Sequence, residues 1–331
     1  MKLTEQIENE YGNVDSQEKK EINRDAINKK IVSVYKDWLT YLQTDTIVKQ
    51  KGLLEMCPIS STIYSQQIEN YSPQDITSLS IQLEQFQKEN LFCYSGYFLT
   101  TLIMKDYQKT KRKEPYLIIT ENLDTSINHL CFQLNGPSVF IQGSTGKDTC
   151  ERMHSGNVII TGNIGENSCN SMKGGIVTVQ KDSENSLASH LKGGEIIIYG
   201  NVKNKISTQS CSSMKNGIIT VKGNAQNIGH CMLGGKIIVE GNVTGHIGNV
   251  MYDGEIIIHG NAEHVGCGMR NGKIMVQGKI EMIGHNETFN INDKFCPRWG
   301  KIYEKDIQVF PQKNEGVYAF LKRLKMKIMD K

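Results

Sequence analysis

The sequence from Leu134 to about residue 290 repeats itself, and this repeat constrains the fold more than any other feature. A unit that begins with Met or Leu starts eight times, and its starts are 19, 19, 19, 23, 18, 19 and 18 residues apart. A fixed period with one insertion is typical of a solenoid, because each coil must return the chain to the same place one strand spacing further on. The starts are Leu134, Met153, Met172, Leu191, Met214, Met232, Met251 and Met269.

Each unit carries a short strand between two glycines. One glycine follows the start by three residues in every unit from Met153 onward, and a second follows by nine residues except where Lys181 replaces it. The fifth and seventh positions are Ile or Val, as in Ile196 and Ile198, whereas the fourth and eighth are mostly polar. This alternation predicts a strand that buries its fifth and seventh side chains.

A second short segment precedes the next start in the later units. It ends in Ile228-Gly229, Ile247-Gly248, Val265-Gly266 and Ile283-Gly284. Two short strands in a coil of this length indicate a parallel β-helix, because the blades of a propeller need about 40 residues. We therefore predict a mainly β protein, with a single-stranded parallel β-helix of about eight coils over residues 116–290.

The flanking regions have a different composition. Residues 1–115 are rich in Lys, Glu, Gln and Asn, and apolar side chains from Ile31 to Leu42 recur at helical spacing. Ser72 followed by Pro73 is typical of a helix start. We predict a mainly helical N-terminal cap domain over residues 1–115, because a first coil without a cap exposes open strand edges. Residues 291–331 form a C-terminal extension with a predicted amphipathic helix, whose apolar set is Val317, Phe320, Leu321, Leu324 and Ile328.

Charge and cysteine usage narrow the classes of function. The formal net charge is only +3, which argues against a nucleic-acid-binding protein. The nine cysteines include no CxxC pair, so no zinc or iron–sulfur spacing is present and reduced thiols are expected. The sequence contains no signal peptide and no apolar run of membrane-spanning length, so we expect a cytoplasmic protein without a membrane span.

The unit from Met214 to Asn224, with Ile228-Gly229 before the next Met232, resembles the GXGXG repeat family. That family includes the C-terminal domain of the glutamate synthase large subunit and the β-helical subunit of formylmethanofuran dehydrogenase, which has a counterpart in the formyltransferase/hydrolase complex. The resemblance covers roughly residues 130–290 and implies a right-handed β-helix with no catalytic, cofactor-binding or metal-binding residues of its own. The lengthened coil from Leu191 to Ser213 and the free-standing chain favour the formylmethanofuran dehydrogenase branch.

Three functions follow as hypotheses. The first is a non-catalytic scaffold subunit of a cytosolic multi-subunit enzyme similar to formylmethanofuran dehydrogenase. The second is a free-standing β-helix of the glutamate synthase type that assists an amidotransferase. The third is an independent β-helix enzyme acting on polysaccharide, which needs clustered carboxylates. The outward eighth position carries one acid, Glu240, among seven coils, so the third hypothesis is the weakest.

Several residue patterns have a plain structural interpretation. Cys150, Cys169 and Cys211 precede successive starts by three residues, and we interpret them as small core residues rather than as a metal or redox site. The starting methionines are interpreted as a packed core column. The segment from Gly143 to Thr149 resembles part of a phosphate loop but lacks its full spacing.

The sixth position of the strand gives the candidate interaction face. Because the fifth and seventh side chains point inward, alternation places the sixth outside. This row is apolar in most coils, and contiguous apolar patches on a surface usually mark a contact. We expect the helices of the chain to cover part of it and partner subunits or a second copy to cover the rest. The residues are Phe140, Ile159, Ile197, Ile238, Ile257 and Met275.

Overall fold

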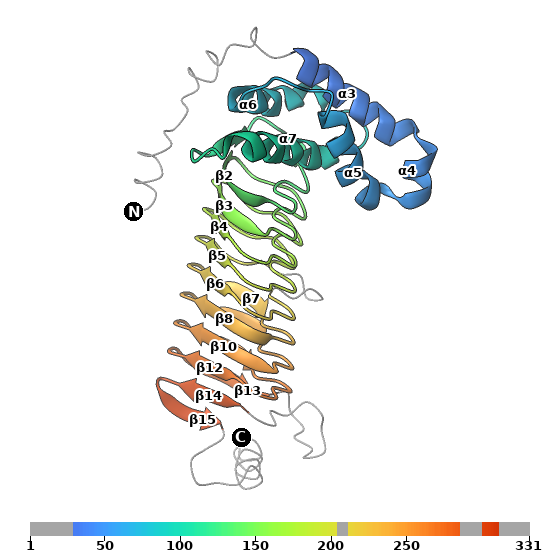
Figure 1. Cartoon of the computed structure of the whole chain (residues 1–331). Coiled ribbons are helices and arrows are strands. Elements are labelled where there is room, and N and C mark those ends of the chain that lie inside the picture. The colour runs from blue at the N-terminus through green and yellow to red at the C-terminus, as the bar shows by residue number, and fades with distance from the viewer. Residues whose placement is uncertain (1–28, 204–210, 285–299, 311–331) are drawn as a thin grey trace.

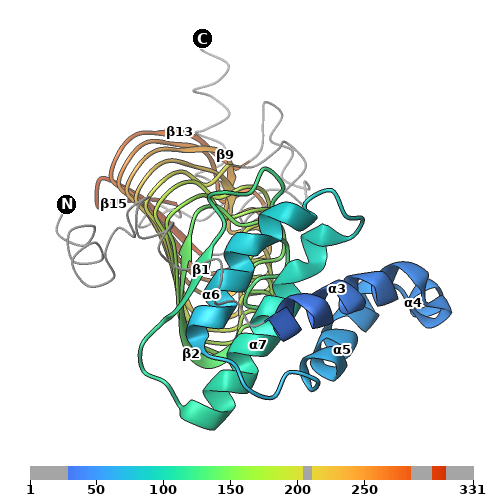
Figure 2. The ribbon, with the colours of Figure 1, turned by 90° about the horizontal axis from the view of Figure 1, so that it is seen from above.

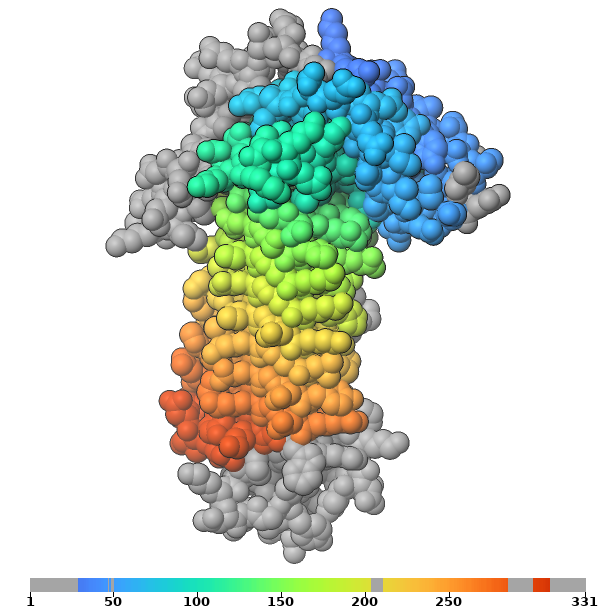
Figure 3. Space-filling view, in the orientation of Figure 1, coloured from blue at the N-terminus to red at the C-terminus, as the bar shows by residue number. Residues whose placement is uncertain are grey.

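The structure of this protein is a computed structural model, which describes residues 29–203, 211–284 and 300–310. The chain forms a parallel β-solenoid of about eight turns, and a helical region lies at its N-terminal end (Figure 1). The predicted mainly β fold with a helical N-terminal region is therefore confirmed. In the space-filling view the coils stack as a narrow column, and the wider helical region overhangs it on one side (Figure 3).

Two sheets form the walls of the solenoid. The long sheet has 11 strands in parallel order, except that the last pair is antiparallel. Its strands are β1 (Tyr116–Ile119), β2 (Asn135–Gln142), β3 (Ser155–Ile160), β4 (Ile176–Val179), β5 (Glu195–Ile198), β6 (Ile218–Val221), β8 (Leu233–Val239), β10 (Asp253–Ile258), β12 (Lys273–Val276), β14 (Lys301–Glu304) and β15 (Ile307–Phe310). The second sheet has four strands, β7 (Ala225–Ile228), β9 (Val243–Ile247), β11 (Ala262–Val265) and β13 (Ile280–Ile283).

The alternation read from the sequence sets the core. Ile196 and Ile198 at the fifth and seventh positions of β5 are fully buried, as are the equivalent residues of β8 and β10. The starting methionines, such as Met172, also have no exposed surface, so they form the predicted core column. Gly194 shows why glycine is required before the strand. Its φ is +91°, and a Cβ there would lie 2.7 Å from the carbonyl oxygen of Gly175 in the preceding coil.

The helical region confirms the predicted helix start at Ser72. Ser72 caps α6 (Pro73–Gln82), its hydroxyl accepting from the backbone N–H of Asp75, while the Asp75 carboxylate accepts from the Ser72 backbone N–H. The predicted apolar helical face lies on α3, where Trp38 and Leu42 are buried. The helices are α3 (Lys29–Thr44), α4 (Thr46–Lys51), α5 (Leu53–Ser65), α6 (Pro73–Gln82) and α7 (Ser95–Thr110), with 3-10 turns at Leu83–Phe86 and Phe92–Tyr94.

The helical region caps the first coil by supplying hydrogen bonds to its open backbone edge. On the long-sheet side, Thr77 of α6 donates its hydroxyl to the carbonyl of Leu117 at 2.8 Å, and the N–H of Ile119 donates to the Ser80 hydroxyl at 3.0 Å. On another side, the N–H of Cys131 donates to the Thr100 hydroxyl of α7 at 2.8 Å. Figure 2 shows α6 and α7 lying across the end of the solenoid. These bonds satisfy donors and acceptors that a missing coil would otherwise pair.

The long sheet continues past residue 290, where the β-helix is predicted to end. β14 pairs in parallel with β12, and Ile302 is fully buried beside Ile274. Gly300 takes the place of the glycine that precedes each strand, with a φ of +104°. The predicted C-terminal amphipathic helix lies outside the described residues. Of the helices that the structure describes, none is both long and apolar enough to cross a bilayer.

Candidate functional site

The six predicted face residues lie in one row on the outer surface of the long sheet, with the buried Thr178 and with Thr220 at two places in it. Strand register places Phe140 beside Ile159, Ile197 beside Thr220, and Ile238 beside Ile257, which is followed by Met275. Ile159, Ile197, Ile238, Ile257 and Met275 are partly exposed, whereas Phe140 is buried. The alternation argument therefore gives the correct orientation, and the accessible part of the row begins at Ile159.

Three further apolar residues flank this row, and the sequence analysis missed them. Ile176 and Ile218 occupy the mostly polar fourth position of their units, yet their side chains are 41% and 42% exposed. Tyr199, at the eighth position on the other side of the row, is 37% exposed. We call the combined surface of Ile159, Ile176, Ile197, Tyr199, Ile218 and Ile238 the apolar patch. The signal in the sequence was the loss of polarity at the fourth position in two coils.

Over β8, β10 and β12 the apolar row of Ile238, Ile257 and Met275 continues, but charged side chains flank it. Lys236 lies 2.9 Å from a carboxylate oxygen of Glu255, whose other oxygen is 3.8 Å from Lys273. Lys222 pairs with Glu240, and both occupy the eighth position of their units, on the other side of the row. These pairs are partly exposed, and such pairs contribute about 0–1 kcal/mol each. The apolar patch over β3–β8 is thus bordered by alternating charges, which begin at Lys222 after β6 and continue over β8–β12 beside the apolar row.

This face is poorly equipped for hydrolysis. Glycoside hydrolysis needs two neighbouring carboxyl groups with different tasks. Both Glu240 and Glu255 are engaged with lysines, and they stand in different columns. Among the described strands, no pair of facing carboxylates stands on the apolar patch. The arrangement can bind an apolar surface, and it offers no acid–base pair.

The helical overhang leaves this face open. Figure 2 shows α3, α4 and α5 projecting on the side away from β15, whereas the long sheet lies along the opposite side of the solenoid. The helical region packs most closely on the first strands, through α6 against β1 and α7 against β2. Within the described residues, the long sheet from β3 to β12 therefore has no helix packed over it.

A scan against known protein families and a search of curated proteins both return no match for this chain. The GXGXG resemblance therefore stays a prediction.

The predicted cysteine column exists and extends further than expected. The buried thiol of Cys150 is hydrogen-bonded to those of Cys131 and Cys169, and these hydrogen bonds together with burial raise its pKa well above the usual thiol value. Cys211 lies in the same column, and burial raises its pKa to about 12. A thiol held protonated in this way is a poor nucleophile and a poor metal ligand. The described residues contain no group of three or more His, Cys, Asp or Glu side chains placed to hold a metal ion.

The segment that resembles a phosphate loop is an ordinary coil corner. The N–H of Gly146 donates to the carbonyl of Ile127, and the N–H of Asp148 donates to the carbonyl of Glu166. Lys147 pairs with Glu166 at 2.8 Å. Since neighbouring coils already take these donors and the lysine, the segment has no cradle to offer a phosphate.

Proposed function

We propose that this chain is a non-catalytic scaffold subunit that docks another protein chain on its apolar patch. The single observation that carries the proposal is the patch itself, in which β3, β4, β5, β6 and β8 each present an outward apolar side chain, with Glu195, Thr178 and Thr220 between them. Isolated exposed apolar side chains are normal, but a contiguous set on a flat face usually marks a protein contact. The hydrogen-bonded coils hold these side chains in fixed register, so little ordering is needed when a partner binds.

The occupant that fits is a partner protein with an apolar centre and a charged margin. The ladder of Lys222, Lys236, Glu240, Glu255 and Lys273 lies next to the patch and carries both signs. A partner with complementary charges would be held in register by this margin, because rim charges contribute more to specificity than to affinity. The resemblance to the β-helical subunit of formylmethanofuran dehydrogenase agrees with this role and suggests a cytosolic oxidoreductase complex.

The test places charges on the patch without touching the core. Ile197→Lys combined with Ile218→Lys should leave the solenoid folded, because both side chains point outward. The tagged parent chain, purified from its own cells, should bring down stable partner chains and show a larger mass in light scattering than one 37.2 kDa chain. The double variant should lose those partners and scatter as a single chain.

A matched control carries the same change on the second sheet. Thr244 of β9 and Glu281 of β13 are exposed there, and their replacement by Lys should leave assembly unchanged. A folded Ile197/Ile218 variant that assembles like the parent would show that the apolar patch is not the docking surface. Turnover of a substrate by the purified chain alone would contradict the non-catalytic role.

A further inference from the structure

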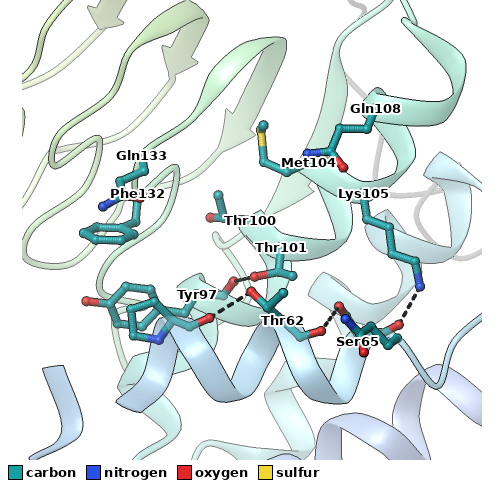
Figure 4. Close-up of a pocket in the computed structure, with 12 residues that line it drawn as sticks. Thr62, Ser65, Tyr97, Thr100, Thr101, Met104, Lys105, Gln108, Phe132 and Gln133 are labelled. Carbon is teal, nitrogen blue, oxygen red and sulfur yellow. Dashed lines mark hydrogen bonds between the residues drawn. The ribbon is translucent and has the colours of Figure 1, made fainter. Parts of the chain in front are cut away.

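A cleft of about 370 Å³ lies where α5, α7 and the first coil meet, on a different part of the molecule from the apolar patch. Figure 4 shows Phe132 and Gln133 entering it from the coil, Met104 and Gln108 from α7, and Thr62 from α5. Small-molecule sites have volumes of roughly 300–1,000 Å³, and a dry cavity of about 150 Å³ already holds benzene. The cleft is therefore large enough for one or two rings.

The floor of the cleft is apolar and held in place. Tyr97 is only 3% exposed, and its ring stacks on His129 with centroids 4.5 Å apart. Phe132 meets Tyr97 edge to face, with centroids 5.0 Å apart. Met104 and Pro58 complete the apolar lining. Because these contacts tie α7 to the first coil, the floor exists before any ligand arrives.

The rim of the cleft is polar but neutral. Gln66, Gln108 and Gln133 stand on three different elements, and the structure shows no hydrogen bond from their side-chain amides to another described residue. Each amide offers two donors and one acceptor oxygen. The Thr62 hydroxyl donates to the carbonyl of Pro58, which leaves its oxygen as an acceptor. The Thr101 hydroxyl is bonded to the carbonyl of Tyr97 and to the Ser61 hydroxyl.

The one charged lining residue already has partners. Lys105 donates to the carbonyl oxygens of Ser65 and Ile68 at 2.7 and 2.6 Å, where it caps the end of α5. No carboxylate is among the lining residues. A cationic ligand would thus find no counter-charge among the lining residues, and Lys105 has at most one N–H left to donate to an anion. The lining favours a ligand without net charge.

We infer that this cleft binds a small neutral ligand rich in hydroxyl groups, on the scale of a mono- or disaccharide. A hydroxyl both donates and accepts, which matches a rim that mixes amide donors with hydroxyl and amide acceptors. The C–H face of a sugar ring is apolar and suits the floor of Phe132 and Met104. A protein partner needs about 800 Å² of surface on each side, so a hollow of this size fits a small molecule better.

Saturation-transfer NMR with a panel of neutral sugars tests the inference on the full chain. The probes are glucose, galactose, N-acetylglucosamine, maltose and cellobiose at about 10 mM, because ligands of this size commonly bind near ~1 mM. We expect saturation transfer to at least one of them. Gln66→Leu combined with Gln108→Leu should weaken this binding at least about tenfold, since two rim amides are lost.

The control is Gln67→Leu, which changes the exposed neighbour of Gln66 outside the cleft and should bind like the parent. Phe132→Ala gives an independent check of the floor, with circular dichroism to show that the chain is folded. No binding of any sugar in the panel would overturn the inference. Binding that survives the Gln66/Gln108 change would also overturn it, because the ligand would then sit elsewhere.

Discussion

The coils of this solenoid share one wall but close in two different ways. In the N-terminal coils, over residues 127–203, the wall opposite the long sheet consists of turns with every second residue in the left-handed region. Asp148, Cys150 and Arg152 have φ values of +57°, +59° and +54°. In the C-terminal coils, over residues 225–284, a strand of the second sheet runs up to the position equivalent to Thr149. Left-handed residues remain after that strand, as at Gly229 and Cys231 with φ values of +73° and +51°. The long sheet is regular through both regions.

The difference follows from the side chains that each region turns inward. The N-terminal coils bury Thr149 and Ser168, whose hydroxyls donate to the carbonyls of Gly146 and Gly165 three residues earlier. Short polar side chains of this kind stabilise turns by bonding the nearby backbone. The C-terminal coils bury Ile228 and Ile247 instead, and branched aliphatic side chains favour strands. A solenoid therefore needs one regular wall, and the rest of the coil can vary.

The largest expected effect tests whether the long sheet supports both regions equally. Val179→Asp lies in the N-terminal coils and Val239→Asp in the C-terminal coils, and both valines are fully buried in the same column. Each change buries an unpaired charge, so each should cost at least about 4 kcal/mol and unfold the solenoid. Thermal melting followed by circular dichroism measures this.

The control for these variants is Ile238→Asp, one residue from Val239 but on the outer face. It should lower the melting temperature by only a few degrees, roughly 1 kcal/mol or less. A near-native melt for Val239→Asp would show that the assigned register is wrong. If only one of the two core variants unfolded, the long sheet would not stabilise the two regions equally.

The same comparison explains which parts of the fold could be predicted from the sequence. The long sheet was predictable because Ile or Val at the fifth and seventh positions and glycine before the strand recur in each coil. The left-handed turns were not predicted, because the segments around Cys150 and Cys169 mix Asp, Asn, Ser and Thr without a period of two. β14 was missed because its glycine, Gly300, lies 28 residues after Gly272, and no starting methionine precedes it.

The candidate site shows a similar division. The row from Ile159 to Met275 followed from alternation alone, because orientation in a strand is a local property. Ile176 and Ile218 were missed, because their exposure depends on neighbours in the coils above and below. The cleft combines Gln66, Gln108 and Gln133 from three elements that meet only in the folded chain, and no local pattern in the sequence joins them.

The next effect in size is a pH dependence that belongs to the N-terminal end. His129 is 3% exposed in the first coil, and burial lowers its pKa from 6.5 to about 4. On acidification the unfolded chain therefore binds a proton at His129 at a higher pH than the folded chain does. The stability of the folded state falls as the pH drops from about 6.5 toward 4. The difference in pKa corresponds to about 3 kcal/mol. Denaturant titrations at pH 7 and pH 4.5 measure most of this loss.

His129→Phe isolates this contribution, because the ring keeps its stack on Tyr97 but cannot take up a proton. The pKa values of Asp148 and Glu151 are raised by burial, so their protonation at low pH favours the folded chain and partly offsets the loss. The comparison of His129→Phe with the parent removes this common effect. We expect the variant to lose less stability than the parent at pH 4.5. Equal losses would mean that His129 titrates normally in the folded protein.

The smallest effect concerns the thiols, which should differ between the two regions in reactivity rather than in stability. Cys150 and Cys169 in the N-terminal coils are fully buried, whereas Cys231 at a C-terminal corner is partly exposed. Partial burial raises the pKa of Cys231, and the nearby Arg270 offsets part of this rise. Cys296 lies outside the described residues, so Cys296→Ser is the background for every variant. At pH 8 an aromatic disulfide reagent should modify Cys231 and the partly exposed Cys93 at least about 100-fold faster than the buried thiols, because the reacting thiolate must be accessible.

Cys231→Ser should remove one fast equivalent without shifting the melting temperature, whereas Cys150→Ser should leave the fast equivalents unchanged. If Cys150 reacted as fast as Cys231 in the folded chain, the cysteine column of the N-terminal coils would be open to solvent. The two regions would then not differ in the accessibility of their thiols.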